Sequence, residues 1–185
     1  MDLVHELKGL LQPITQPTPL EIKQVLKGIG CTHDRIAPYL SEPDPQSSLP
    51  YGRKVILRTD LFEVIVINIP GKTETPVHDH GHSIGCVYVV FGGFINRLYK
   101  VGEHSKEPVL QTETRYGQGE CLLIDDGLIH SMGNPVQKNM VSLHVYSPPI
   151  HDNKLYSSST GSSPLQISRR NSGNLSSIWA GEKGP

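Results

Sequence analysis

The first 45 residues carry apolar side chains at helical spacing. A first helix is indicated by four leucines that would share one side of it: Leu3, Leu7, Leu10 and Leu11. Pro13 interrupts this pattern. A second helix is predicted to begin at Pro19, because Thr18 can cap it and Glu21 can return a hydrogen bond to the cap's backbone N–H. Its expected buried face consists of Ile22, Val25, Leu26 and Ile29, and its end is marked by Gly28 and Gly30.

From Tyr51 the pattern changes to short β-branched runs separated by Gly, Pro, Asn and Asp, which is typical of an all-β sandwich or barrel. Six strands are predicted: Lys54–Arg58, Phe62–Ile69, Ile84–Val90, Phe94–Tyr99, Cys121–Ile124 and Met140–Ser147. Two runs with little polar interruption, Val64–Ile67 and Val87–Val90, are expected to be covered on both faces.

The chain of 185 residues suits a single core with appendages. Residues 1–50 are predicted to form an N-terminal helical segment packed on a barrel of residues 51–155. Residues 156–185 are rich in Ser, Gly and Asn and are predicted to form a flexible C-terminal tail.

Charge and cysteine usage narrow the class of protein. The formal net charge of −1 gives no global field that would hold nucleic acid, and no run of about 18 apolar residues predicts a membrane span. The N-terminus lacks the pattern of a secretory signal. The cysteines, at positions 31, 86 and 121, fit neither a disulfide framework nor a CxxC zinc site, so a reducing, cytoplasmic location is expected. The oligomeric state is left open, a monomer included.

Three of the nine histidines form a pattern with metal-binding chemistry. In His78-Asp79-His80 the two imidazoles lie two residues apart, so on an extended strand both project from one face. His130 follows a glycine-bounded turn that could bring it to the same point. Imidazole is the commonest protein metal ligand. The competing interpretation is that His78 and His80 are surface residues of a turn.

The spacing of these histidines resembles the two conserved motifs of the cupin family, a double-stranded β-helix or jelly-roll barrel. The first motif is His78-x-His80, four residues, Gly85, six residues, Gly92. The second is Gly119, five residues, Asp125-x-Gly127, two residues, His130, three residues, Asn134. Gly85 stands where many cupins place a glutamate ligand, so three neutral histidines are expected. A divalent ion held by them keeps its full charge and favours an anionic ligand such as a thiolate.

A later segment narrows the resemblance. Ser142, His144 and Tyr146 alternate along a predicted strand and could form a hydroxyl–imidazole–phenol relay on one face, although an ordinary half-polar strand gives the same pattern. Together with the histidines and with Tyr51-Gly52-Arg53 upstream, this segment resembles cysteine dioxygenase, the thiol dioxygenase branch of the cupins. The resemblance covers roughly residues 51–149.

The resemblance implies a role for each of these residues. Fe(II) would be bound by His78, His80 and His130. Arg53 would pair with the substrate carboxylate, with Tyr51 near that ion pair. The Tyr146 hydroxyl would lie near the substrate and oxygen, oriented by His144 with Ser142 behind it. The bond between Ser147 and Pro148 would be cis.

One departure from animal members of the family concerns a covalent link. Those members carry a cysteine at the position of Gly85, joined to the tyrosine that matches Tyr146. Here the nearest cysteine is Cys86, and an offset of one residue points a strand side chain to the opposite face. We therefore predict that no Cys–Tyr thioether forms. Cys31 and Cys121 are interpreted as small buried apolar residues.

The expected function is conversion of L-cysteine and O2 to cysteine sulfinic acid by an Fe(II)-dependent thiol dioxygenase. Arg53 favours an α-amino acid over 3-mercaptopropionate, because relatives that act on that acid often have glutamine at this position. The alternatives are a 3-mercaptopropionate dioxygenase, a non-catalytic metal-binding cupin that binds a small ligand, and a metal-dependent isomerase.

Overall fold

A computed structural model describes residues 2–102 and 107–156 of the chain. In this part, the N-terminal region forms α1 (Leu3–Leu11), α2 (Pro19–Gly28), α3 (His33–Ile36) and the 3₁₀-helix η1 (Ala37–Tyr39). The strands that follow are β1 (Gly52–Arg58), β2 (Glu63–Ile69), β3 (Val77–His78), β4 (Ile84–Phe91), β5 (Gly93–Val101), β6 (Pro108–Gly117), β7 (Cys121–Ile124), β8 (Ile129–Gly133), β9 (Met140–Ser147) and β10 (Leu155–Tyr156).

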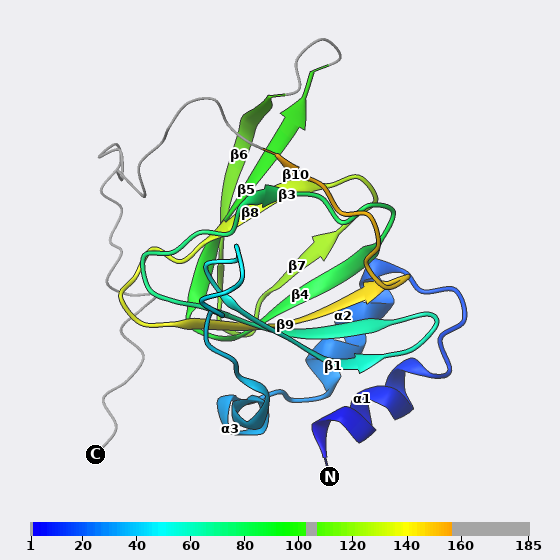
Figure 1. Ribbon diagram of the computed structural model, residues 1–185. Helices are drawn as coiled ribbons and strands as arrows, with labels where there is room; N and C mark the ends of the chain where they lie inside the picture. The colour runs from blue at the N-terminus through cyan, green and yellow to red at the C-terminus, as the bar shows by residue number, and fades with distance from the viewer. Residues whose placement is uncertain (1, 103–106, 157–185) are drawn as a thin grey trace.

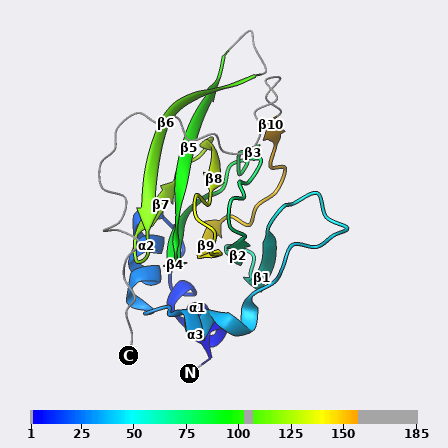
Figure 2. The same cartoon turned by 90° about the vertical axis from the view of Figure 1, so that its left-hand side faces the viewer.

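The described strands form two antiparallel sheets that face each other. One has the order β1-β2-β9-β4-β7 and the other β10-β3-β8-β5-β6 (Figures 1 and 2). Helix α2 packs on β4 and β7, and α1 packs on β1, so the helices cover the outer face of the first sheet (Figure 1). This two-sheet β core with N-terminal helices confirms the predicted cupin fold.

The core consists of two apolar clusters separated by the first sheet. The cluster on its outer face combines helix residues such as Leu7 and Leu26 with Val64 and Leu143 of the strands. The cluster between the sheets includes Ile65 and Phe94, among other residues. Because every residue of β2 is buried, the prediction that this run is covered on both faces is confirmed.

The two long helices largely match their predicted ends. Helix α2 has the predicted capping box, in which the Thr18 hydroxyl accepts from the Glu21 N–H and the Glu21 carboxylate accepts from the Thr18 N–H. In α1 the side chains of Leu3, Leu7 and Leu11 are buried, whereas Leu10 is 42% exposed. The prediction that Leu10 shares one side of α1 with the other three leucines was wrong, because the buried stripe of this helix includes only those three.

All six predicted strands are present, with ends displaced by at most two residues, but four strands were missed: β3, β6, β8 and β10. Strand β6 is exposed along most of its length and pairs only with β5, so it lacks the apolar alternation that marks a half-buried strand. Strands β3 and β10 have two residues each, too few for any periodicity.

The predicted boundaries at residues 50 and 155 stay predictions. Strand β1 begins at Gly52, and Leu155 and Tyr156 pair with Val77 and His78 as β10. The predicted tail beyond Tyr156 lies outside the described residues. Among the helices of residues 2–102 and 107–156, none is long and apolar enough to cross a lipid bilayer.

Candidate metal centre

Two of the three histidines of the motifs lie on paired strands of the second sheet, and the third lies just beyond one of these strands. His78 ends β3 and is the pairing partner of His130 on β8. Before β8, Gly127 adopts a positive φ of 72°, and the Leu128 N–H donates to the Asp125 carbonyl, so this turn directs the chain into the strand. His80 lies two residues beyond β3, so the expectation that one regular strand carries both His78 and His80 was wrong.

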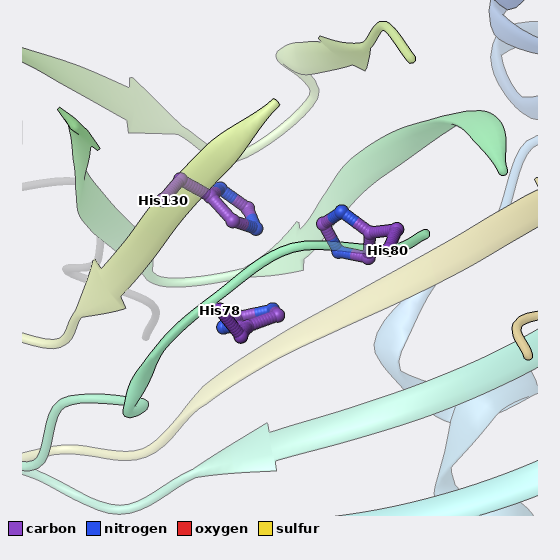
Figure 3. Close-up of side chains that lie close together, drawn as sticks. All are labelled: His78, His80 and His130. Atoms are coloured by element: carbon purple, nitrogen blue, oxygen red, sulfur yellow. The ribbon is translucent and has the colours of Figure 1, made fainter. Parts of the chain in front are cut away.

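The three imidazoles point toward one another (Figure 3). Their ring centroids are 4.8–5.0 Å apart, and one ring nitrogen of each lies within 4.8 Å of the others. In the described part of the chain, no carboxylate or thiol joins this group. The alternative that His78 and His80 are surface residues of a turn is excluded, since His80 is buried and His78 is partly buried with its ring directed at the other two.

The hydrogen bonds of the rings leave nitrogen lone pairs without a protein partner. His78 Nδ1 donates to the Pro76 carbonyl at 2.8 Å, and His130 Nδ1 donates to Asn96 Oδ1 at 2.8 Å. The buried Nε2 of His130 and Nδ1 of His80 have no hydrogen-bond partner. A buried polar atom without a partner is costly, and a metal ion is a ligand that imidazole nitrogens accept. The site therefore fits a metal ion.

The protonation of these rings also fits metal binding. Burial lowers the pKa of His78, and burial together with the neighbouring His78 lowers the pKa of His80 to about 3. The pKa of His130 lies well below its ordinary value for the same reasons. Imidazole binds a metal ion in its neutral form, so no proton has to be displaced at neutral pH.

A chain of hydrogen bonds on β9 reaches the same point. Ser142 Oγ lies 2.8 Å from His144 Nε2, and His144 Nδ1 lies 2.9 Å from the Tyr146 hydroxyl. That hydroxyl is 3.2 Å from His80 Nε2, and the rings of Tyr146 and His80 stack at 4.9 Å. All of these side chains are buried. Burial raises the pKa of Tyr146, so the phenol keeps its proton. The polar side chains of β9 therefore form a connected, hydrogen-bonded relay rather than the polar face of an ordinary strand.

The strand beneath Tyr146 leaves no room for a side chain at position 85. Gly85 pairs with Tyr146, and a Cβ at this position would lie 2.3 Å from the Val145 carbonyl oxygen and 2.9 Å from Tyr146 Cδ1. Cys86 belongs to the apolar cluster on the outer face, together with Cys31, while Cys121 is only half-buried against it. The side chains of Cys86 and Tyr146 therefore belong to clusters on opposite faces of the sheet.

A cavity of about 400 Å³ opens beside the histidines. Its lining includes His78, His80 and Tyr146, together with Tyr51 and Arg53 of the predicted substrate site. Sequence reasoning missed three further charged residues of this lining, Arg58, Glu63 and Asp79. The bond between Ser147 and Pro148 is cis, as the resemblance implied.

The remaining histidines do not join the cluster. His5, His33, His82 and His151 are exposed, as predicted, and His104 lies outside the described residues. His82 follows His80 by two residues, yet its side chain is 95% exposed. Position in the motif, rather than the number of histidines, therefore decides which imidazoles converge.

Comparison with known proteins gives a family and a set of similar structures. The family model described as cysteine dioxygenase type I matches residues 51–159. An uncharacterized conserved protein with a double-stranded β-helix domain from Klebsiella pneumoniae is 20% identical, with 66% of this chain and 94% of that chain covered and a TM-score of 0.49. A protein from Thermus thermophilus is 17% identical, with coverages of 61% and 94% and a TM-score of 0.47. An RmlC-like cupin protein from Desulfovibrio desulfuricans is 18% identical, with coverages of 54% and 84% and a TM-score of 0.42.

Proposed function

The chain belongs to the cysteine dioxygenase type I family, and from this premise we propose that it is an Fe(II)-dependent thiol dioxygenase that converts L-cysteine to cysteine sulfinic acid. Both atoms of O2 are transferred to the substrate sulfur, which becomes a sulfinic acid. The sulfur supplies the four electrons that O2 takes up, so no external reductant is needed. The observation that carries this proposal is one cavity lined by two of the clustered imidazoles, the Tyr146 phenol and the Arg53 guanidinium.

His78, His80 and His130 would hold the iron. Bound iron supplies coordination positions for substrate and the one-electron chemistry with O2 that side chains lack. Because the described ligand group contains no carboxylate, the three neutral rings leave the charge of the ion uncompensated. This charge favours the thiolate form of the substrate over the thiol. The donor set therefore supports a sulfur substrate.

Arg53, which lines the same cavity, would bind the substrate carboxylate. Its guanidinium is about one-third exposed, and a planar fork of N–H donors matches a carboxylate. Tyr51 lines the cavity beside it. An amino acid held at both ends would present its sulfur in a fixed orientation, which lowers the barrier because the entropy of bringing the reactants together is already lost on binding.

The relay on β9 would orient the Tyr146 hydroxyl toward the substrate. His144 is neutral, because burial holds its pKa well below the ordinary value, so only one of its nitrogens carries a proton. When Ser142 donates to Nε2, the proton sits on Nδ1 and is donated to the Tyr146 oxygen. If the unpartnered Nδ1 of His80 carries that ring's lone pair, its Nε2–H also donates to the Tyr146 oxygen, and the Tyr146 O–H remains free to donate to the substrate. Ser142 and His144 are positioning residues in this proposal.

A cytoplasmic location belongs to this proposal, on the cysteine usage of the sequence alone.

The proposal is tested by incubating iron-loaded protein with cysteine in air and measuring O2 uptake and sulfinate by mass spectrometry. We expect one sulfinate per O2 consumed. His130→Ala should abolish the product, while His82→Ala, which removes an exposed imidazole close to the site, should leave it unchanged. Absence of O2 uptake by the iron-loaded protein would favour the non-catalytic cupin, and a higher kcat/KM with 3-mercaptopropionate would favour that substrate instead.

A further inference from the structure

An irregularity in β1 brings a second arginine into the cavity. Arg53 and Val55 pair with inward-facing residues of β2, and the register then shifts at Ile56. Side chains alternate along a strand, so Arg58 would face outward without the shift. The bulge reverses the alternation, and Arg58 becomes the partner of Glu63. Both arginines therefore line the cavity.

Glu63 is the anion that these two arginines share. Its Oε1 lies 3.3 Å from Arg58 Nη1 and 3.6 Å from Arg53 Nη2, and its Oε2 accepts from the Ile150 N–H at 3.2 Å. The Glu63 side chain is 2% exposed, whereas those of Arg53 and Arg58 are 34% and 48% exposed. A carboxylate removed from water this completely needs a compensating charge.

The shorter of the two contacts joins Glu63 to Arg58. One guanidinium neutralises one carboxylate, so the pair of Arg58 and Glu63 carries no net charge. Among the described residues Arg53 has no ion-pair partner other than this shared Glu63, so its positive charge is left without a carboxylate of its own. The other acid of the lining, Asp79, directs its carboxylate to the start of β10, where it accepts from the N–H of Lys154 just before that strand and from the hydroxyl of Tyr156 in it. It does not contact Arg53 through any described ion pair.

Resting on the proposed function, we propose that Arg58 is a specificity-determining residue: by neutralising Glu63 it keeps Arg53 available for a substrate with one carboxylate. Without Arg58, the Glu63 carboxylate would compete with the substrate carboxylate for Arg53. This role is distinct from that of Arg53, because Arg58 acts on the substrate through Glu63.

The test compares the binding of cysteine and cysteamine, which differ by the carboxylate alone. Dissociation constants are measured under argon on the iron-loaded protein, so binding is read without turnover, and O2 uptake is measured separately. Arg58→Gln removes the neutralising charge, and Glu63→Gln removes the competing one with little change of shape. Lys54→Gln is the matched control, because Lys54 is a cation of the same strand that lies over the Tyr39 ring, outside the cavity lining.

We expect the wild-type protein to prefer cysteine, and Arg58→Gln to reduce that preference by about tenfold, as removal of one charge from a partly screened site implies. The double variant Arg58→Gln, Glu63→Gln should return the preference to within about threefold of wild type, because both charges are gone. Glu63→Gln alone should preserve or increase it, and Lys54→Gln should leave it unchanged.

Either of two results with the variants would overturn the inference. One is an unchanged preference in Arg58→Gln. The other is a loss of preference in Glu63→Gln, which would make Glu63 a support for Arg53 and not its competitor. A wild-type protein without preference for cysteine would overturn it as well. A different result would contradict the proposed function alone: the wild-type protein and the variants show the expected binding preferences, but no O2 is consumed.

Discussion

Asn96 offers a direct test of how the candidate metal centre is built. Its amide oxygen accepts from His130 Nδ1 at 2.8 Å, and both side chains are buried. This bond fixes the proton on Nδ1, so the lone pair of His130 is on Nε2, the buried atom without a protein partner. Asn96→Ala removes the acceptor and allows the ring to rotate and to exchange its proton between the two nitrogens. We expect weaker metal binding although no ligand is changed.

The Asn96→Ala substitution should lower two quantities, the metal affinity and the stability of the metal-free protein. Loss of a partner that orients a metal-binding histidine lowers metal affinity by about 10–100-fold, or about 1.4–2.8 kcal/mol. The protein without metal is also affected, because the buried N–H of His130 loses its acceptor at a cost of about 1–3 kcal/mol. The free energy of unfolding of the metal-free protein should therefore fall by a similar amount.

The assay is competition for Fe(II) between the protein and a chromogenic chelator under argon, with denaturant unfolding of the metal-free protein measured in parallel. Asn96→Asp keeps an acceptor at the same place and adds a charge that strengthens the ligand, so its affinity should be at or above that of wild type. Thr112→Ala, an exposed position on the neighbouring strand β6, controls for a side chain removed without consequence.

An Asn96→Ala protein that folds and binds Fe(II) with an affinity within about twofold of wild type would refute this reasoning, since the expected loss of affinity is at least about tenfold. It would show that the backbone of β8 alone orients His130. An equal loss of affinity in Asn96→Ala and Asn96→Asp would also contradict it, because the hydrogen-bond acceptor is present in only one of the two.

Further predictions concern the strands beneath the relay. Gly85→Ala should lower the free energy of unfolding by about 1–3 kcal/mol in denaturant, because its Cβ would meet the Val145 carbonyl, whereas Gly9→Ala, with open space in α1, should raise it by about 1 kcal/mol. Tyr146→Phe keeps the ring but removes the hydroxyl, so kcat for O2 uptake with cysteine should fall by about 100-fold; an unchanged kcat would remove this residue from the mechanism. Peptide mapping should find Tyr146 unmodified, and a crosslink to Cys86 would contradict the placement of that thiol on the outer face.

The parts of the molecule that could be predicted from the sequence are those whose signal is local. The Thr18 capping box and the apolar run of β2 each act within a few residues, and each was found where it was expected. The HxH spacing brought its two rings together as expected, although β3 ends at His78. The strands that were missed lack such a signal. Strand β6 is exposed and polar, and β3 is held by its pairing with His130, which is 52 positions further along the chain than His78.

The presence of Arg58 in the cavity lining could not be predicted from the sequence, because it depends on the register of β1. Strict alternation from Arg53 places Arg58 on the outer face of the sheet, where it would be an ordinary surface cation. The shift at Ile56 depends on how β1 pairs with β2, which no local pattern in the sequence encodes. The same strand pairing places Glu63 opposite both Arg58 and Tyr146, so one buried carboxylate lies between the arginine pair and the relay. We therefore expect the preference for cysteine over cysteamine to depend on the bulge at Ile56 as much as on the motif residues. A variant that restores regular pairing at Ile56 should lose this preference, whereas its three histidines should stay in place.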